Sequence, residues 1–112
     1  MADAPKSNPA PLRSTLAGDP EMAELVTMFV SELADRRTAI ASAMETRRVD
    51  DLKRLAHQLR GSSASYGLKP LGDVAGRLED AIKQLQATDT QNLESVRTQV
   101  DELIEMCDRA TG

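Results

Sequence analysis

The sequence predicts an all-α fold: an antiparallel up-down-up-down four-helix bundle with a short N-terminal helix or turn. Apolar residues recur at three- and four-residue steps in four separate stretches, which is the period of an amphipathic helix. The intervening positions are rich in Glu, Gln, Arg and Lys, which favour helices, whereas one Phe, one Tyr and no Trp leave few strand signals. The connections are short, so neighbouring helices should be antiparallel. A chain of 112 residues is long enough for one core.

The amino-terminal segment differs from the rest in composition. Residues 1–11 hold three of the five prolines together with small polar residues, which predicts a disordered tail, and residues 12–112 are assigned to the bundle. Between Leu12 and Ala17 we expect a short helix or turn, closed by Gly18.

The first long helix is expected to begin at Asp19 and Pro20 and to end near Arg47. Asp is a good capping residue, and Pro suits the first helical position. The apolar stripe of this helix is Met22, Leu25, Val26, Phe29, Leu33, Ile40 and Met44.

A second helix should be capped by Asp50 or Asp51 and stopped by Gly67. Its apolar side is expected to contain Leu52, Leu55, Ala56, Leu59, Ser63 and Tyr66. Because this side is well defined, the direction of every other side chain on the helix follows from it.

Two more helices complete the predicted bundle. Pro70 opens the third, which ends near Ala87, and Asp89 or Thr90 can cap the fourth. The stripe of the third is Leu71, Val74, Ala75, Leu78, Ile82 and Leu85. The stripe of the fourth is Leu93, Val96, Val100, Leu103, Ile104 and Cys107.

Composition excludes several classes of function. A net charge of −4 argues against nucleic-acid binding, which depends on a basic surface. Cys107 is the only cysteine, so no intrachain disulfide can form, and its place in an apolar stripe predicts a buried thiol. One histidine and one distant cysteine supply no metal-ligand set, so no metal or other cofactor is expected. Without an apolar run for a leader or a membrane span, we expect a cytoplasmic protein, and a monomer.

The only histidine, His57, should point away from the core. With about 100° of rotation per residue, the apolar side of the second helix lies opposite it. Its own face carries Lys53, Arg54, Arg60, Gly61 and Ala64, which are all basic or small. An imidazole nitrogen is nucleophilic near neutral pH, and neighbouring cations can stabilise a phosphoryl group on it.

Each of these features also has an ordinary structural interpretation. A lone exposed histidine is usually a solvated side chain, and lysines and arginines around it are often only a solvated face. Gly61, unfavourable inside a helix, suggests close approach by another protein or close packing of two helices. Catalysis of hydrolysis by serine and histidine would need an orienting group and an oxyanion hole, and the spacing provides neither.

The stretch AHQLRGSSASYGL, Ala56 to Leu68, resembles the signature of the histidine phosphotransfer (HPt) family, roughly His-x-Leu-Lys-Gly-Ser/Ala-x-x-x-x-Gly. His57, Leu59, Arg60, Gly61, Ser62 and Gly67 fall on it in register. Arg60 stands where Lys is commoner and keeps the charge. The resemblance extends over about residues 12–110, with an Asp-Pro helix start and a helical pair after the motif.

The resemblance implies that His57 is the phosphoacceptor of a multistep phosphorelay and exchanges a phosphoryl group with a receiver-domain aspartate. It implies that Arg60 supports the phosphoryl group and that Gly61 lets the receiver approach. The partners would be response-regulator receiver domains and a hybrid sensor histidine kinase, with Mg²⁺ in the receiver's acidic pocket. The chain itself would contain no ATPase or kinase catalytic domain.

Further docking residues are predicted from the helical wheel. Gln58 and Ala64 are assigned with Gly61 to the docking face, and Met28 on the outer face of the first helix could help bind a partner or could be exposed by chance. Gly72 and Gly76 expose backbone on the third helix, where they could admit a neighbouring helix or loop or could simply be tolerated.

Two alternative functions remain open at this point. The first is a helical adaptor that is not phosphorylated and docks a receiver or a kinase. The second is a purely structural helical module or a hydrolytic bundle.

Overall fold

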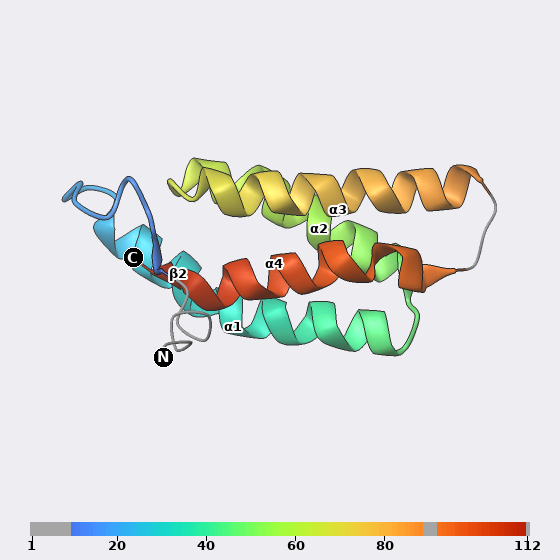
Figure 1. Cartoon of the computed structure of the whole chain (residues 1–112). Helices are drawn as coiled ribbons and strands as arrows, with labels where there is room; N and C mark the ends of the chain where they lie inside the picture. Colours follow the sequence, from blue (N-terminus) through green and yellow to red (C-terminus); the bar gives the residue numbers. More distant parts are fainter. Residues whose placement is uncertain (1–9, 89–91, 112) are drawn as a thin grey trace, which may run out of the picture.

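Four helices make up most of the computed structural model, which describes residues 10–88 and 92–111. In chain order they are α1 (Ala23–Glu45), α2 (Val49–Ser65), α3 (Lys69–Ala87) and α4 (Arg97–Arg109). Consecutive helices run in opposite directions along one elongated bundle, as Figure 1 shows. The predicted all-α, up-down-up-down architecture is confirmed.

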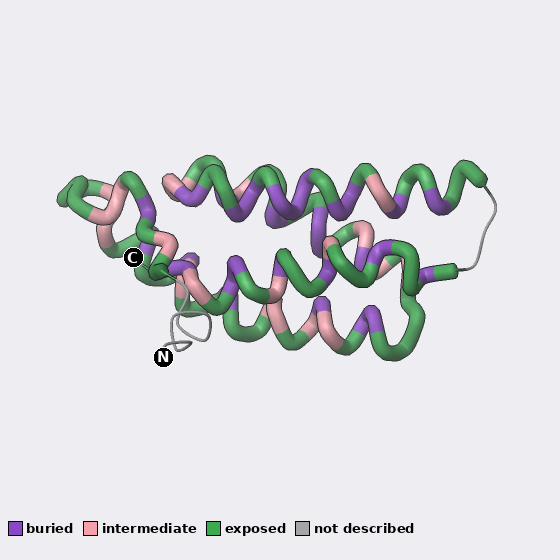
Figure 2. Tube along the Cα trace, in the orientation of Figure 1, coloured by how far each residue is buried: buried purple, intermediate pink, exposed green. Residues whose placement is uncertain are grey.

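The core lies between the inward faces of the helices, where the buried positions gather in Figure 2. It is almost wholly aliphatic, and its one aromatic stack joins Phe29 to Tyr66 with ring centroids 4.7 Å apart. Every residue of the predicted stripe of α3 is buried. Leu25 of the α1 stripe is exposed, so that assignment was wrong; on the wheel it lies at the edge of the stripe, on the side of the exposed Met28.

Helix α1 begins later than predicted. Asp19 shapes the turn before the helix: its Oδ1 accepts a hydrogen bond from the Glu21 amide, and its carbonyl accepts one from the Ala23 amide. The helix ends at Glu45 rather than near Arg47, since Arg47 has a φ of 58° and cannot continue it. The Arg48 amide then donates to the Ala43 carbonyl and completes a Schellman turn.

Helix α2 begins at Val49, so neither Asp50 nor Asp51 caps it, contrary to the prediction. Both carboxylates lie in the first turn, where they complement the helix dipole, and Asp51 pairs with Arg48 at 2.9 Å. The predicted stop at Gly67 is confirmed, because this glycine has a φ of 76°.

The segment from Leu12 to Ala17 is a strand followed by a turn, so the predicted helix is wrong and the predicted turn is confirmed. Strand β1 (Leu12–Arg13) pairs in parallel with β2 (Ala110–Thr111), Leu12 opposite Ala110. The Ser14 hydroxyl donates to the Tyr66 carbonyl at 2.6 Å. Hydrogen bonds therefore join this segment to the residues that follow α4 and to the turn between α2 and α3.

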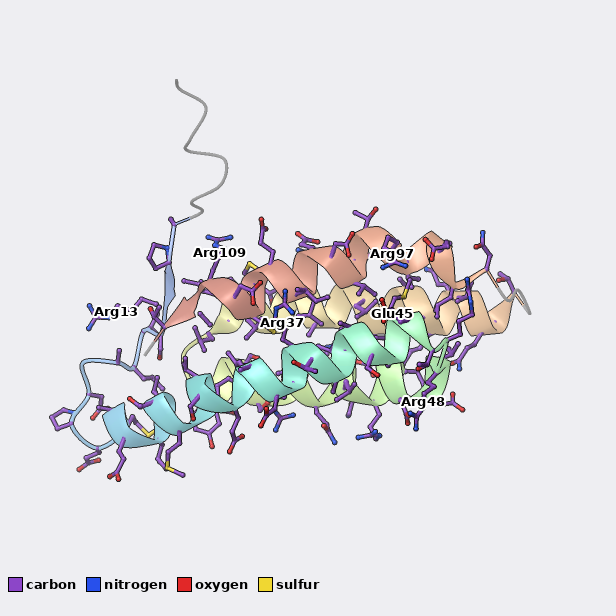
Figure 3. All side chains as sticks on the ribbon, turned by 90° about the horizontal axis from the view of Figure 1, so that it is seen from below. Arg13, Arg37, Glu45, Arg48, Arg97 and Arg109 are labelled. Carbon is purple, nitrogen blue, oxygen red and sulfur yellow. The ribbon has the colours of Figure 1, made fainter. Side chains whose placement is uncertain are left out.

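The predicted fourth helix is divided. Leu93–Val96 form a 3₁₀ turn, η2, and α4 follows it, while the predicted caps Asp89 and Thr90 lie outside the described residues. Figure 3 shows Arg37 at the boundary of α1 and α4, where its Nε donates to Asp108 Oδ1 at 2.6 Å. In the same view Arg109 extends beside β1, where it donates to the Ala10 carbonyl.

Across the described ranges, no helix combines the length and the apolar character needed to cross a membrane.

Candidate functional site

His57 projects from the outer face of α2. Its side chain is 71% exposed, while the neighbouring Ala56 and Leu59 are completely buried. The outward direction predicted from the wheel is thus confirmed. One edge of the ring is nevertheless fixed by a contact with α3.

That contact is made by Glu79. Its Oε2 lies 2.8 Å from His57 Nδ1, and its side chain is only 4% exposed. Sequence reasoning missed this residue. A signal was present: on the wheel Glu79 lies at the edge of the apolar stripe of α3, on the side of Gly72 and Gly76, where a charged side chain is partly buried and needs a partner.

Two cations hold the same buried carboxylate. Arg60 reaches across from α2, and its Nη1 donates to Glu79 Oε1 at 3.1 Å and lies 3.5 Å from Asp80 Oδ1. Lys83, one turn beyond Glu79 on α3, has its Nζ 3.4 Å from Oε2, the oxygen that also contacts His57. Lys83 is the second residue that the sequence reasoning missed.

The charge of Glu79 follows from these contacts. Burial opposes its ionisation, but hydrogen bonds from Arg60 and His57, with the charges of His57 and Lys83, outweigh burial and hold the pKa of Glu79 below its ordinary value. In turn, the hydrogen bond to Glu79 and the charge of Asp80 raise the pKa of Arg60. Glu79 is therefore an anion at neutral pH.

An ionised carboxylate only accepts hydrogen bonds, so the proton in the contact belongs to His57 Nδ1. In a neutral imidazole with its proton on Nδ1, the other nitrogen, Nε2, carries a free lone pair. The arrangement thus fixes the tautomer and leaves the nucleophilic nitrogen on the exposed part of the ring.

The structure does not bring two of the predicted phosphate-stabilising residues to the histidine. Lys53 Nζ donates to Gln86 Oε1 at 2.9 Å, and Arg54 lies 3.4 Å from Asp51 Oδ1. Both contacts point away from His57 along the bundle. Arg60 alone of the three predicted cations shares a partner with the imidazole.

The predicted docking residues lie on the exposed side of α2 and α1. Gln58 Oε1 accepts a hydrogen bond from Arg36 at 3.4 Å, which joins the two helices beside His57. Gly61 and Ala64 are exposed, and a Cβ atom on Gly61 would meet nothing within 4 Å. Met28 is 54% exposed and lies eight residues before Arg36 on α1, about 12 Å farther along the helix axis.

In the part of the chain that the structure describes, no three His, Cys, Asp or Glu side chains gather as a metal-binding group. The expectation of a metal-free chain stays a prediction.

The chain is thus a four-helix bundle with an outward histidine that a buried carboxylate orients, a helical module whose exposed imidazole can carry a covalently bound group. The family model of the Hpt domain matches residues 24–111, and the chain belongs to this family. Hpt domains are phosphotransfer domains that carry phosphoryl groups and are not themselves catalytic enzymes, and they interact with receiver domains and kinases of phosphorelays. Neither the comparison with curated proteins nor that with solved structures returned a match.

Proposed function

We propose that this chain accepts a phosphoryl group on His57 Nε2 from a receiver-domain aspartate and donates it to a receiver in turn, in the cytoplasm. The observation that carries the proposal is the 2.8 Å contact between His57 Nδ1 and Glu79. It orients an exposed ring and, in the neutral imidazole, places the proton on Nδ1 and the lone pair on Nε2, which is the nitrogen that a nucleophile needs.

The transfer is a displacement at phosphorus. The Nε2 lone pair forms the N–P bond as the bond between phosphorus and the aspartyl oxygen breaks, and the aspartate leaves as a carboxylate. The ring gains positive charge and keeps its proton on Nδ1, where the Glu79 carboxylate compensates the charge at 2.8 Å. Donation to the next receiver is the reverse reaction.

Arg60 and Lys83 supply the positive charge beside the reacting group. Arg60 is 49% exposed even while it contacts Glu79, so its guanidinium is open to a phosphoryl group as well. Lys83 shares Glu79 Oε2 with the imidazole and is also exposed. Lys53 and Arg54 are placed farther along the bundle and would act only through the general field of the surface.

The receiver is expected to dock on the face formed by Gln58, Gly61 and Ala64 of α2, with Met28 at its edge. The open space above Gly61 supports this assignment, since a receiver loop can approach the helix backbone there. The exposed imidazole lies on the same face of α2.

The test is transfer from a phosphorylated receiver. The chain is incubated with receivers of the source organism, phosphorylated by a small phosphodonor in the presence of Mg²⁺. We expect base-stable, acid-labile phosphate on wild type and none on His57→Gln, whose circular dichroism should be unchanged. Receiver binding that persists in both proteins without any labelling would contradict the proposal and favour a non-phosphorylated adaptor.

A further inference from the structure

Two glycines of α3 lie directly against Arg60. A Cβ atom on Gly72 would come 3.2 Å from the Arg60 carbonyl oxygen, and one on Gly76 would come 3.2 Å from Arg60 Nε. Gly72 thus meets the main chain of Arg60, and Gly76 meets its side chain. The neighbouring helix that these glycines admit is therefore α2, as one of the two predicted interpretations had it.

The contact at Gly76 follows the stem of the arginine. The same Cβ would lie 3.4 Å from Cδ and 3.6 Å from Cγ of Arg60. The side chain therefore lies flat on the bare backbone of α3. Gly76 itself is buried, although it belongs to a helix whose next residue, Arg77, is exposed.

Helix geometry places the acceptors of Arg60 on the same face as this glycine. Residues three and four positions apart are neighbours on a helix surface, and Glu79 and Asp80 follow Gly76 by three and four residues. When the stem of Arg60 lies across Gly76, its guanidinium is therefore close to both carboxylates: Nη1 lies 3.1 Å from Glu79 Oε1 and 3.5 Å from Asp80 Oδ1.

The stem of Arg60 borders open space. An open depression runs beside it, lined by Arg60, Gly72, Asp73, Gly76, Arg77 and Asp80. A side chain on residue 76 could push the guanidinium into this open space without disturbing the core. Glycine in the middle of a helix is unfavourable relative to alanine, so the helix alone gives no reason for it.

We propose that Gly76 is a positioning residue. Because it has no side chain, the stem of Arg60 can lie across α3 at this point, and the guanidinium then reaches Glu79, the carboxylate that orients His57. The consequence for phosphotransfer rests on the proposed function. The effect of Gly76 on the position of Arg60 does not depend on that function, and it can be measured in the free protein.

The test compares Gly76→Ala and Gly76→Leu with Arg60→Ala, and it measures the pKa of Glu79 by carboxyl ¹³C NMR in the free chain. We expect the pKa of Glu79 to rise slightly in Gly76→Ala and, in Gly76→Leu, to rise as far as in Arg60→Ala. Gln84→Ala, at an exposed position of the same helix, is the matched control and should leave the pKa unchanged.

The second readout is the rate of transfer from a phosphorylated receiver. Arg60→Ala and Gly76→Leu should each slow transfer about tenfold, the size expected for one charge-assisted hydrogen bond at a half-exposed site. In the Arg60→Ala background, Gly76→Leu should cause no further loss, because the residue through which it acts is gone.

The proposal is overturned if Gly76→Leu folds and keeps the wild-type pKa of Glu79, or if it slows transfer equally with and without Arg60. If Gly76→Leu does not fold, Gly76→Ala decides by the same two measurements. If no phosphate appears on His57, the proposed function is wrong, but the NMR comparison still tests whether Gly76 positions Arg60.

Discussion

Glu79 and His57 come from different helices and have opposite exposures, yet Oε2 of the buried carboxylate and Nδ1 of the exposed imidazole lie 2.8 Å apart. A side chain that is largely in water is thus oriented by one that is almost completely out of it. Since side chains on a protein surface usually sample several rotamers, this contact holds the ring in one orientation before a partner arrives.

Replacing Glu79 by Gln should slow phosphotransfer about tenfold and leave the bundle folded. The amide keeps the size of the side chain but loses the charge that compensates the phosphorylated ring. Single-turnover transfer from a phosphorylated receiver measures the loss, and ¹⁵N NMR of His57 should show a smaller fraction with the proton on Nδ1. Wild-type transfer by Glu79→Gln would show that the contact is not used.

Lys83→Ala should reduce the transfer rate more than Lys53→Ala does. Lys83 shares an oxygen of Glu79 with the imidazole, whereas Lys53 is hydrogen-bonded to Gln86. Both residues are lysines, so the two variants remove the same charge and form a matched pair. An equal loss from both would mean that the general field of the surface matters more than local contact.

Two substitutions at Gly61 should affect the stability of the chain and its binding to the receiver differently. A Cβ atom there meets nothing within 4 Å, so Gly61→Ala should stabilise the free chain by roughly 0.5–1 kcal/mol through helix propensity. Gly61→Gln should also fold but should bind the receiver more weakly, since its side chain projects into the approach path. Urea unfolding and receiver titration measure the two effects, and unchanged receiver affinity in Gly61→Gln would contradict the docking assignment.

Stability should fall in acid partly through Glu79. Because the pKa of this carboxyl in the folded chain is below its ordinary value of 4.5, its contribution is fully present above that value and is lost as the pH falls through the lower pKa of the folded state. Urea unfolding between about pH 3 and pH 6 should therefore show a weaker pH dependence in Glu79→Gln than in wild type. Glu94, whose pKa Arg97 also lowers, is common to both proteins and cancels.

Cys107 should resist alkylation until the chain unfolds. Burial raises the pKa of its thiol to about 12, and only the thiolate reacts. At about pH 8, iodoacetamide should label the native protein far more slowly than the protein in urea, as mass spectrometry can follow. Equal rates would show that this end of α4 opens readily.

Much of the fold could be read from residues close together in the sequence. The period of the apolar residues predicts four helices, and Gly67 ends one of them because it can adopt a positive φ. The helical wheel predicts that His57 points outward, as it does. The strand at Leu12 could not be predicted in this way. Leu12 pairs with Ala110 at the other end of the chain, and a strand of two residues is too short to show a periodic pattern of its own.

What the sequence determined by itself is the direction of each side chain on its own helix, because 3.6 residues per turn is a local property. What only the tertiary structure decided is which faces meet: that Glu79 reaches His57, that Lys83 joins it where Lys53 does not, and that Arg60 lies on Gly76. Those contacts depend on the offset and rotation of α3 against α2, which are set by how two rows of side chains interlock, and neither helix contains that information alone.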